Sequence, residues 1–177
     1  MIFNKTTIDG VYTIDPEPHN DNRGFFARAF CVKELAGAGI DMNAVQINTS
    51  HNYKKYTLRG LHSQIAPNEE IKIIRCVRGA IFDVAVDVRP SSPTFGKYVS
   101  AELTQENGRM LVVPKGFAHG YMTLCDEADV LYFVSEAYAP GSEKGYRFDD
   151  PFFDIKWPSK QGLTTSEKDL AWPYLNK

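Results

Sequence analysis

Turn signals divide this chain into many short segments that are rich in β-branched and aromatic residues. Such segments are typical of β-strands, and the glycine, proline, asparagine and aspartate between them are typical of turns. Short strands at this spacing predict an all-β fold, which is a sandwich, a jelly roll or a small barrel. The expected strands cover residues 11–15, 25–30, 44–49, 57–62, 71–77, 80–88, 98–103, 109–113, 120–124 and 130–137.

Helix signals are few. Residues 32–36 contain helix formers and are followed by Gly37, a residue type that commonly ends helices. Residues 166–170 indicate a second brief helix. We expect both helices to be short and peripheral, and we expect the 177 residues to form one domain over 1–177.

Charge and composition exclude several classes of partner. The net charge of −2 gives no general attraction to nucleic acid or to an anionic membrane. No basic and apolar leader is visible at the start, and no apolar stretch approaches the ~20 residues that span a bilayer. The three cysteines lack metal-site spacing, which favours free thiols in a reducing compartment. We therefore expect a soluble cytoplasmic protein.

Two histidines stand close to glycines at the ends of apolar segments. One is His62 in Arg59-Gly60-Leu61-His62, and the other is His119, which Gly120 follows. Two such histidines in a small all-β chain suggest a barrel with chemistry at its centre.

The segment 81–88 has two interpretations. Asp83, Ala85 and Asp87 share one strand face, and the opposite face is apolar. The plainer interpretation is a strand with a solvated acidic face. The other is a barrel strand whose polar face lines a cavity.

A series of motifs along nearly the whole chain resembles the dTDP-4-dehydrorhamnose 3,5-epimerase family, the enzymes of deoxysugar-nucleotide synthesis. No single motif is decisive, but the set and its order are highly specific. The resemblance implies a cupin-type jelly-roll barrel, a homodimer that exchanges strands, and a nucleotide-sugar substrate used in deoxysugar and polysaccharide synthesis. The motifs are Asp21-Asn22-Arg23-Gly24-Phe25-Phe26, Gln46-Ile47-Asn48, Leu58-Arg59-Gly60-Leu61-His62, Lys72, Asp83–Arg89, Ser92–Gly96, Pro114–Gly120, Tyr132, Asp150-Pro151, Ile155–Pro158 and Ser166–Asp169.

The chemistry of a 4-keto sugar explains the residue types that this resemblance implies. The hydrogens at C3 and C5 are acidic because both carbons adjoin the carbonyl. Epimerisation therefore needs a base on one face, an acid on the other and a cation near the ketone oxygen. By resemblance His62 is the base and Asp169 its orienting carboxylate. Lys72 would stabilise the enolate oxygen, and Tyr132 would return the proton.

Further positions match the family's substrate-binding residues. By resemblance Arg23 and Arg59 contact the pyrophosphate, because a planar guanidinium binds phosphate oxygens in pairs. Arg23 is a candidate for reaching across the dimer. The positions near the nucleotide are Gln46, Asn48, Tyr138, Glu143 and Lys168, and the remaining polar lining is Asp83 and His119.

Each residue also has a plainer interpretation when it is taken alone. A lone strand histidine is more often a hydrogen-bonded structural residue. Lys72 between two isoleucines is compatible with a solvent-facing position, and Tyr132 in an apolar run is compatible with the core. The joint occurrence of these residues in the family's order favours the functional interpretation.

Metal chemistry is the main alternative within this fold. Metal-binding cupins usually place two histidines one residue apart, whereas Ser63 and Gln64 follow His62 here. We therefore expect no metal and no cofactor. The competing functions are a cupin-type 3,4-ketoisomerase, a single-position epimerase on a CDP- or GDP-linked sugar, and a non-catalytic sugar-nucleotide-binding protein.

Three departures from the family pattern surround an intact acid–base set. Ser63 stands where the family usually has an aromatic residue, and Glu70 replaces a glutamine two residues before Lys72. Arg28 replaces a glutamate that is implied in accepting a hydrogen bond from thymine, and arginine has donors only. The identity of the nucleotide and the number of carbons epimerised therefore stay open.

Overall fold

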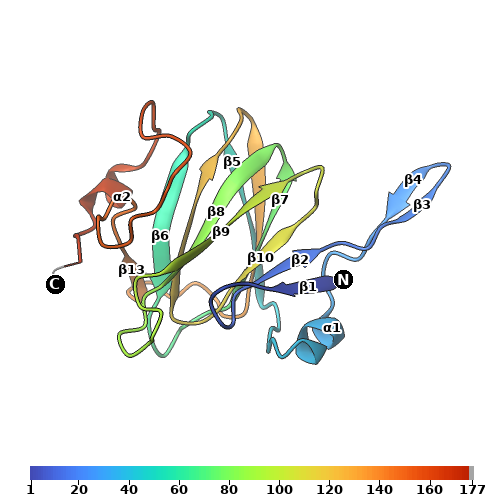
Figure 1. Cartoon of the computed structure of the whole chain (residues 1–177), viewed down its shortest axis with the longest axis horizontal. Coiled ribbons are helices and arrows are strands. Elements are labelled where there is room, and N and C mark those ends of the chain that lie inside the picture. Colours follow the sequence, from blue (N-terminus) through green and yellow to red (C-terminus); the bar gives the residue numbers. More distant parts are fainter. Residues whose placement is uncertain (176–177) are drawn as a thin grey trace.

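Two facing β-sheets make up the body of the protein, as the computed structural model of residues 1–175 shows (Figure 1). One sheet has the strand order β1-β2-β10-β7-β12-β5, and the other has the order β13-β6-β11-β8-β9. The strands are β1 (Ile2–Lys5), β2 (Tyr12–Asp15), β3 (His19–Asp21), β4 (Gly24–Phe26), β5 (Gln46–Asn52), β6 (Leu58–Gln64), β7 (Lys72–Arg78), β8 (Ala80–Asp87), β9 (Tyr98–Thr104), β10 (Met110–Val113), β11 (Phe117–Thr123), β12 (Ala128–Val134) and β13 (Glu143–Gly145), and the helices are α1 (Val32–Gly37) and α2 (Glu167–Ala171). The expected all-β fold with short helices is confirmed.

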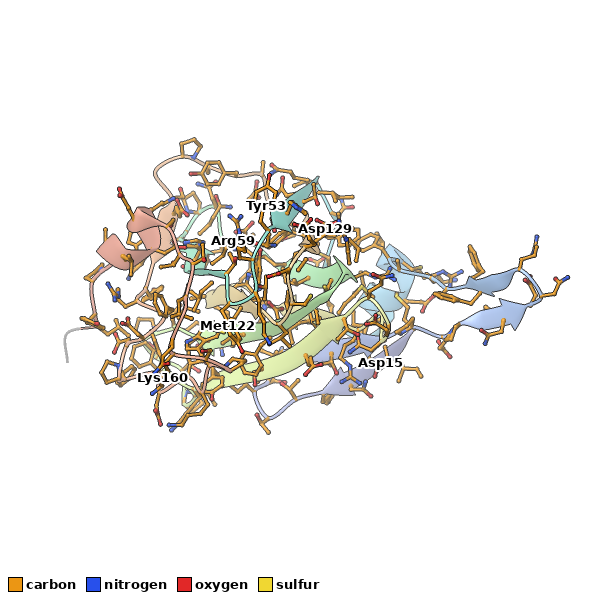
Figure 2. The ribbon with its side chains drawn as sticks, turned by 90° about the horizontal axis from the view of Figure 1, so that it is seen from above. Asp15, Tyr53, Arg59, Met122, Asp129 and Lys160 are labelled. Carbon is orange, nitrogen blue, oxygen red and sulfur yellow. The ribbon has the colours of Figure 1, made fainter. Side chains whose placement is uncertain are left out.

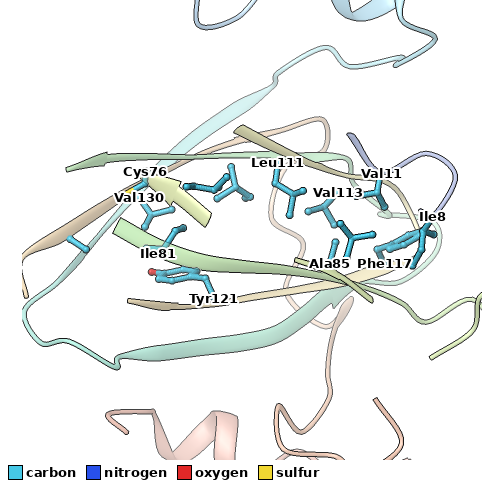
Figure 3. Packing of buried hydrophobic residues seen from close by; sticks show 14 residues of the cluster. Ile8, Val11, Cys76, Ile81, Ala85, Leu111, Val113, Phe117, Tyr121 and Val130 are labelled. Atoms are coloured by element: carbon cyan, nitrogen blue, oxygen red, sulfur yellow. The ribbon is translucent and has the colours of Figure 1, made fainter. Parts of the chain in front are cut away.

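The main core fills the space between the two sheets (Figure 3). Ile74 and Val130 enter it from the six-stranded sheet, and Ile81, Ala85 and Tyr121 enter it from the five-stranded sheet. All five are at most 1% exposed. Burying an isoleucine or valine side chain stabilises a fold by about 1.5–3 kcal/mol, so this layer holds the sheets together.

The polar face of β8 points into this interior. Asp83 and Asp87 are fully buried, so the expectation of a solvated acidic face is wrong and that of a polar interior face is confirmed. The opposite face of β8 carries Val84 and packs under the C-terminal segment, including Phe153. This segment covers the outside of the five-stranded sheet, so that sheet has apolar contacts on both faces.

The hairpin β3–β4 projects away from both sheets (Figures 1 and 2). A strand was expected over residues 25–30, but only Gly24–Phe26 is extended and it pairs with His19–Asp21 alone. Phe25 and Phe26 are consequently 67% and 74% exposed. Phe25 and Phe26 therefore stay outside the core, whereas Phe30 packs against a core cluster and stacks on Phe133 at 5.3 Å between ring centroids.

The other expected strands and both expected helices are found within a few residues of their predicted bounds. Ser166 caps α2 by accepting a hydrogen bond from the amide of Asp169 at 3.0 Å. Cys31, Cys76 and Cys125 are free thiols. Among the described residues no helix has the length and apolar character needed to cross a bilayer.

Candidate active site

A cavity of about 590 Å³ opens between the two sheets, beside the C-terminal segment. Five strands and the segment around α2 form its wall, and Arg59 lies on the side of the molecule where that segment folds back (Figure 2). The lining residues are Asn48, Ser50, Thr57, Leu58, Arg59, His62, Lys72, His119, Tyr121, Tyr132, Thr164, Thr165, Ser166, Lys168 and Asp169.

His62 and Asp169 form a close pair in this wall. Nε2 of His62 lies 2.6 Å from Oδ1 of Asp169, and the amide of Gly60 donates to Oδ2 at 3.3 Å. Asp169 is 4% exposed. Burial raises the pKa of its carboxyl, but the hydrogen bonds and charge of His62, with those of Gly60 and Ser166, outweigh burial and lower the pKa. Asp169 is therefore an ionised partner that fixes the imidazole.

Glycines let β6 and β11 approach each other closely next to both histidines. A Cβ on Gly60 would lie 2.6 Å from Cα of Gly120, and a Cβ on Gly120 would lie 2.8 Å from the carbonyl oxygen of Arg59. Gly60 also has φ +120°, a conformation that L side chains rarely adopt. The glycines flanking His62 and His119 are thus required by the backbone.

His119 is bonded to a different carboxylate. Its Nε2 lies 2.7 Å from Oδ1 of Asp83, and the two residues are 5% and 0% exposed. Burial raises the pKa of Asp83, while the proximity of His119 and Lys72 opposes that rise. The pair forms a buried polar wall behind the cavity.

Lys72 points into the cavity from β7. It shares its strand face with Ile74, which belongs to the core between the sheets, so the solvent-facing alternative is wrong. Its Nζ lies 3.1 Å from Oε1 of Glu70, and the two side chains are 14% and 9% exposed. The glutamate that departs from the family pattern therefore contacts the lysine directly.

Tyr132 lies on β12, in the sheet opposite the one that carries His62. Its ring meets that of His119 edge-on at 6.0 Å between centroids. Burial is the main reason that the pKa of Tyr132 lies well above its ordinary value. The phenol is therefore protonated at neutral pH, on the wall facing His62.

A hydrogen-bonded group that the sequence analysis missed joins this tyrosine to Arg59. Ser50 lies between Tyr121 and Tyr132, and the amide of Asn52 joins Tyr121 to Arg59. Strand alternation was the available signal, because Tyr121 shares a face with His119, and Ser50 and Asn52 share a face with Asn48.

The structure gathers only part of the expected substrate-binding set. Of the remaining candidates, Asn48, Arg59 and Lys168 line the cavity, and Lys168 pairs with Glu143. Gln46 lies next to the lining residues: its side chain donates a hydrogen bond to Asn48 and accepts one from the backbone amide of Tyr138. Arg23 is on the projecting hairpin, 85% exposed and paired with Asp21, so within one chain it is not brought to the site.

The described residues offer no group of three or more histidine, cysteine, aspartate or glutamate side chains arranged to hold a metal ion. His62 and His119 are each engaged by one carboxylate instead. The polar groups of the cavity are suited to moving protons.

An imidazole and a phenol on opposite walls, with an ammonium between the sheets, define an enzyme that exchanges protons beside a carbonyl. Comparison with known proteins narrows this class. The family model described as dTDP-4-dehydrorhamnose 3,5-epimerase matches residues 5–177. The chain belongs to this family of isomerases, and its fold is the cupin-type jelly roll expected from the motifs.

Individual relatives agree over nearly their full length. The dTDP-4-dehydrorhamnose 3,5-epimerase of Sinorhizobium fredii is 45% identical over 99% of this chain and 90% of its own. The crystal structure of the Bacillus anthracis enzyme with TDP and PPi bound has a TM-score of 0.94 at 37% identity, covering 98% of this chain and 99% of that one. The Legionella pneumophila enzyme in complex with dTDP-4-keto-L-rhamnose has a TM-score of 0.92 at 39% identity, covering 98% and 92%.

Proposed function

We propose that the protein epimerises a nucleotide-linked 4-keto-6-deoxyhexose at C3 and C5, with dTDP-4-dehydro-6-deoxyglucose as the substrate. The observation that carries the proposal is the His62–Asp169 pair, 2.6 Å between Nε2 and Oδ1, facing Tyr132 across the cavity. The names and ligands of the relatives support the substrate class.

The reaction proceeds through an enolate. His62 removes the proton from the carbon beside the ketone, and Asp169 stabilises the imidazolium that forms. The C–H electron pair moves to the ketone oxygen, where Lys72 stabilises the negative charge. Tyr132 then gives its proton to the same carbon from the opposite face, which inverts the configuration.

The nucleotide diphosphate lies towards the open side of the cavity. Arg59 binds the pyrophosphate, and Asn48 and Lys168 lie near the nucleotide, with Gln46, Tyr138 and Glu143 around them. Arg28 pairs with Glu34 and offers donors only, so it does not replace the hydrogen-bond acceptor that the family pattern implies at this position. Thymidine recognition therefore has to be tested against other bases.

The protein works as a homodimer that exchanges strands, and each chain forms one domain over 1–177. It acts in the cytoplasm, in deoxysugar synthesis for polysaccharides such as lipopolysaccharide. The projecting hairpin supports the dimer, because Phe25 and Phe26 are exposed on a two-stranded sheet that, within the described residues, pairs with neither main sheet. Docking of this hairpin on a second copy covers both rings and carries Arg23 to the neighbour's pyrophosphate.

A deuterium wash-in experiment tests the function. Purified protein is incubated in heavy water with dTDP-, CDP- and GDP-linked 4-keto-6-deoxysugars, and incorporation is located by mass spectrometry and NMR. We expect deuterium at C3 and C5 of the dTDP sugar. Labelling of one carbon alone identifies a single-position epimerase, and movement of the carbonyl identifies a ketoisomerase. Absence of exchange in every sugar overturns the proposal.

A further inference from the structure

One serine lies between two tyrosine hydroxyls in the cavity wall. Oγ of Ser50 is 2.8 Å from Oη of Tyr121 and 3.4 Å from Oη of Tyr132. The acid–base scheme above gives Ser50 no role. Its position next to the proposed acid suggests one.

The orientation of a neighbouring amide sets the direction of these hydrogen bonds. Nδ2 of Asn52 donates to the carbonyl oxygen of Ala128 at 3.0 Å, so Oδ1 faces Tyr121 and Arg59. Tyr121 donates its proton to this oxygen at 3.1 Å, and its own oxygen accepts from Ser50. A serine has a single hydroxyl proton, so Ser50 donates to one tyrosine at a time.

We propose that Ser50 is a positioning residue for Tyr132. The hydroxyl of Ser50 donates to Tyr121 at rest and turns to donate to the phenolate of Tyr132 during turnover. This inference rests on the proposed function and deepens it. When the O–H bond of Tyr132 breaks, its proton forms the new C–H bond with the enolate's electron pair, and the carbonyl is restored. Ser50 keeps its proton and only rotates, so the step balances.

The surroundings of Tyr132 make such a donor valuable. Burial disfavours the phenolate, and Tyr121 and Asp83 disfavour it further, whereas a hydrogen bond from Ser50 favours it. A hydrogen bond to an ionised acceptor is stronger than one to a neutral acceptor. The groups that face or adjoin Tyr132 are Asn48 and Ser50 on β5, Lys72 on β7, Asp83 on β8, and His119 and Tyr121 on β11.

The test compares Ser50→Ala, Ser50→Thr and a matched control in the deuterium assay. Thr49→Ala is the control, because it also removes a hydroxyl from β5 but from an exposed position on the other strand face. We expect Ser50→Ala to lower kcat about ten- to a hundredfold with little change in KM. The basic limb of its pH profile should change, Ser50→Thr should restore most of the rate, and Thr49→Ala should match the wild type.

A double-mutant cycle shows whether Ser50 acts through Tyr132. In the Tyr132→Phe background, Ser50→Ala should cause no further loss. An equal loss in both backgrounds, a raised KM at unchanged kcat, or a Ser50→Ala variant as fast as the wild type overturns the proposal. A wild type that exchanges no deuterium overturns the proposed function instead.

A spectroscopic readout needs no turnover. In protein with isotope-labelled tyrosine, the ring signal of Tyr132 is assigned by its loss in Tyr132→Phe. We expect Ser50→Ala to shift this signal and Thr49→Ala to leave it in place. A signal that Ser50→Ala does not move overturns the contact on which the inference depends.

Discussion

His62 and His119 lie directly opposite each other on β6 and β11, yet their imidazoles are hydrogen-bonded to different carboxylates, those of Asp169 and Asp83. The side chain of His62 is 29% exposed towards the cavity, whereas that of His119 is 5% exposed. The partner of His62 comes from α2, and the partner of His119 comes from β8 within the barrel. The paired histidines therefore differ in position, because His62 is open to the cavity and His119 belongs to its buried wall.

Replacing the carboxylate of Asp169 tests the proposed role of His62. Asp169→Asn keeps the size of the side chain but removes the charge that stabilises an imidazolium on His62. We expect kcat to fall about a hundredfold or more, while the urea midpoint of unfolding changes little by comparison. Asp149→Asn, which alters an exposed carboxylate paired with Arg147, is the control and should keep its rate. Full activity in Asp169→Asn would contradict the assignment.

Acid should weaken the fold through Asp87. Burial alone would raise the pKa of this carboxyl, but hydrogen bonds from Arg89, Ser92 and Thr94 hold it well below its usual range. Because the folded pKa is lower than the unfolded value of about 3.9, this stabilisation is present above pH ~4 and is lost as the pH falls further. Asp87→Asn should cost about 3 kcal/mol at neutral pH.

Urea denaturation at neutral pH and near pH ~3 measures the effect. The difference in unfolding free energy between the wild type and Asp87→Asn should narrow at the lower pH. The control is Asp154→Asn, whose carboxylate is exposed and pairs with Lys156. A difference that stays constant with pH would show that Asp87 does not titrate differently in the two states.

The close approach of β6 and β11 predicts an asymmetric response to adding a methyl group. Gly60→Ala places a Cβ 2.6 Å from Cα of Gly120 at a positive φ, so we expect a loss of about 2 kcal/mol or more and reduced activity. Gly37→Ala in α1 meets nothing within 4 Å and should change stability by less than about 1 kcal/mol. Thermal unfolding and initial rates compare the two, and equal effects would refute the steric argument.

The ion pair between Glu70 and Lys72 predicts that substitution of Glu70 raises kcat. Glu70→Gln removes the carboxylate that lies 3.1 Å from Nζ of Lys72. The positive charge of Lys72 is then no longer partly neutralised and stabilises the enolate oxygen more strongly. We expect kcat to rise about two- to tenfold. Glu69→Gln, an adjacent charge change, is the control. A fall in kcat would mean that Glu70 is needed to hold the lysine in place.

Mixed dimers test the proposed position of Arg23. Arg23→Ala should weaken binding of the nucleotide diphosphate about tenfold, and His62→Ala should abolish exchange. If the hairpin reaches a neighbour's cavity, a mixed dimer of the two variants contains one cavity with both residues intact. At a substrate concentration well below KM, activity after mixing should then exceed that of the same amount of Arg23→Ala alone, and it should be absent from His62→Ala alone. No gain at any mixing ratio would place Arg23 outside the partner's site.

The sequence was sufficient for features that depend on strand alternation and on motifs. Alternation groups Asp83 with Asp87 on one strand face, the family's order pairs His62 with Asp169, and helix signals predict the short α2. Which faces of β7 and β8 turn inward does not follow from alternation. Alternation indicates the strand faces of Ser50 and Tyr121, but it does not predict the contact of Ser50 with Tyr121 and Tyr132, which are 71 and 82 residues away in the sequence. The segment 25–30 has a strand's composition, but among the described residues only Gly24–Phe26 forms a strand, and it pairs with His19–Asp21 and with neither main sheet.

Asp169 lies on α2, and the last strand of either sheet ends at Gly145, well before it. Its partner His62 stands 107 residues earlier. A chain emerging from the ribosome therefore contains every strand of both sheets while His62 still lacks its carboxylate partner. The His62–Asp169 pair is completed last, when the trailing segment folds back over β6. A protease that removes this segment would break the pair without removing a strand from either sheet.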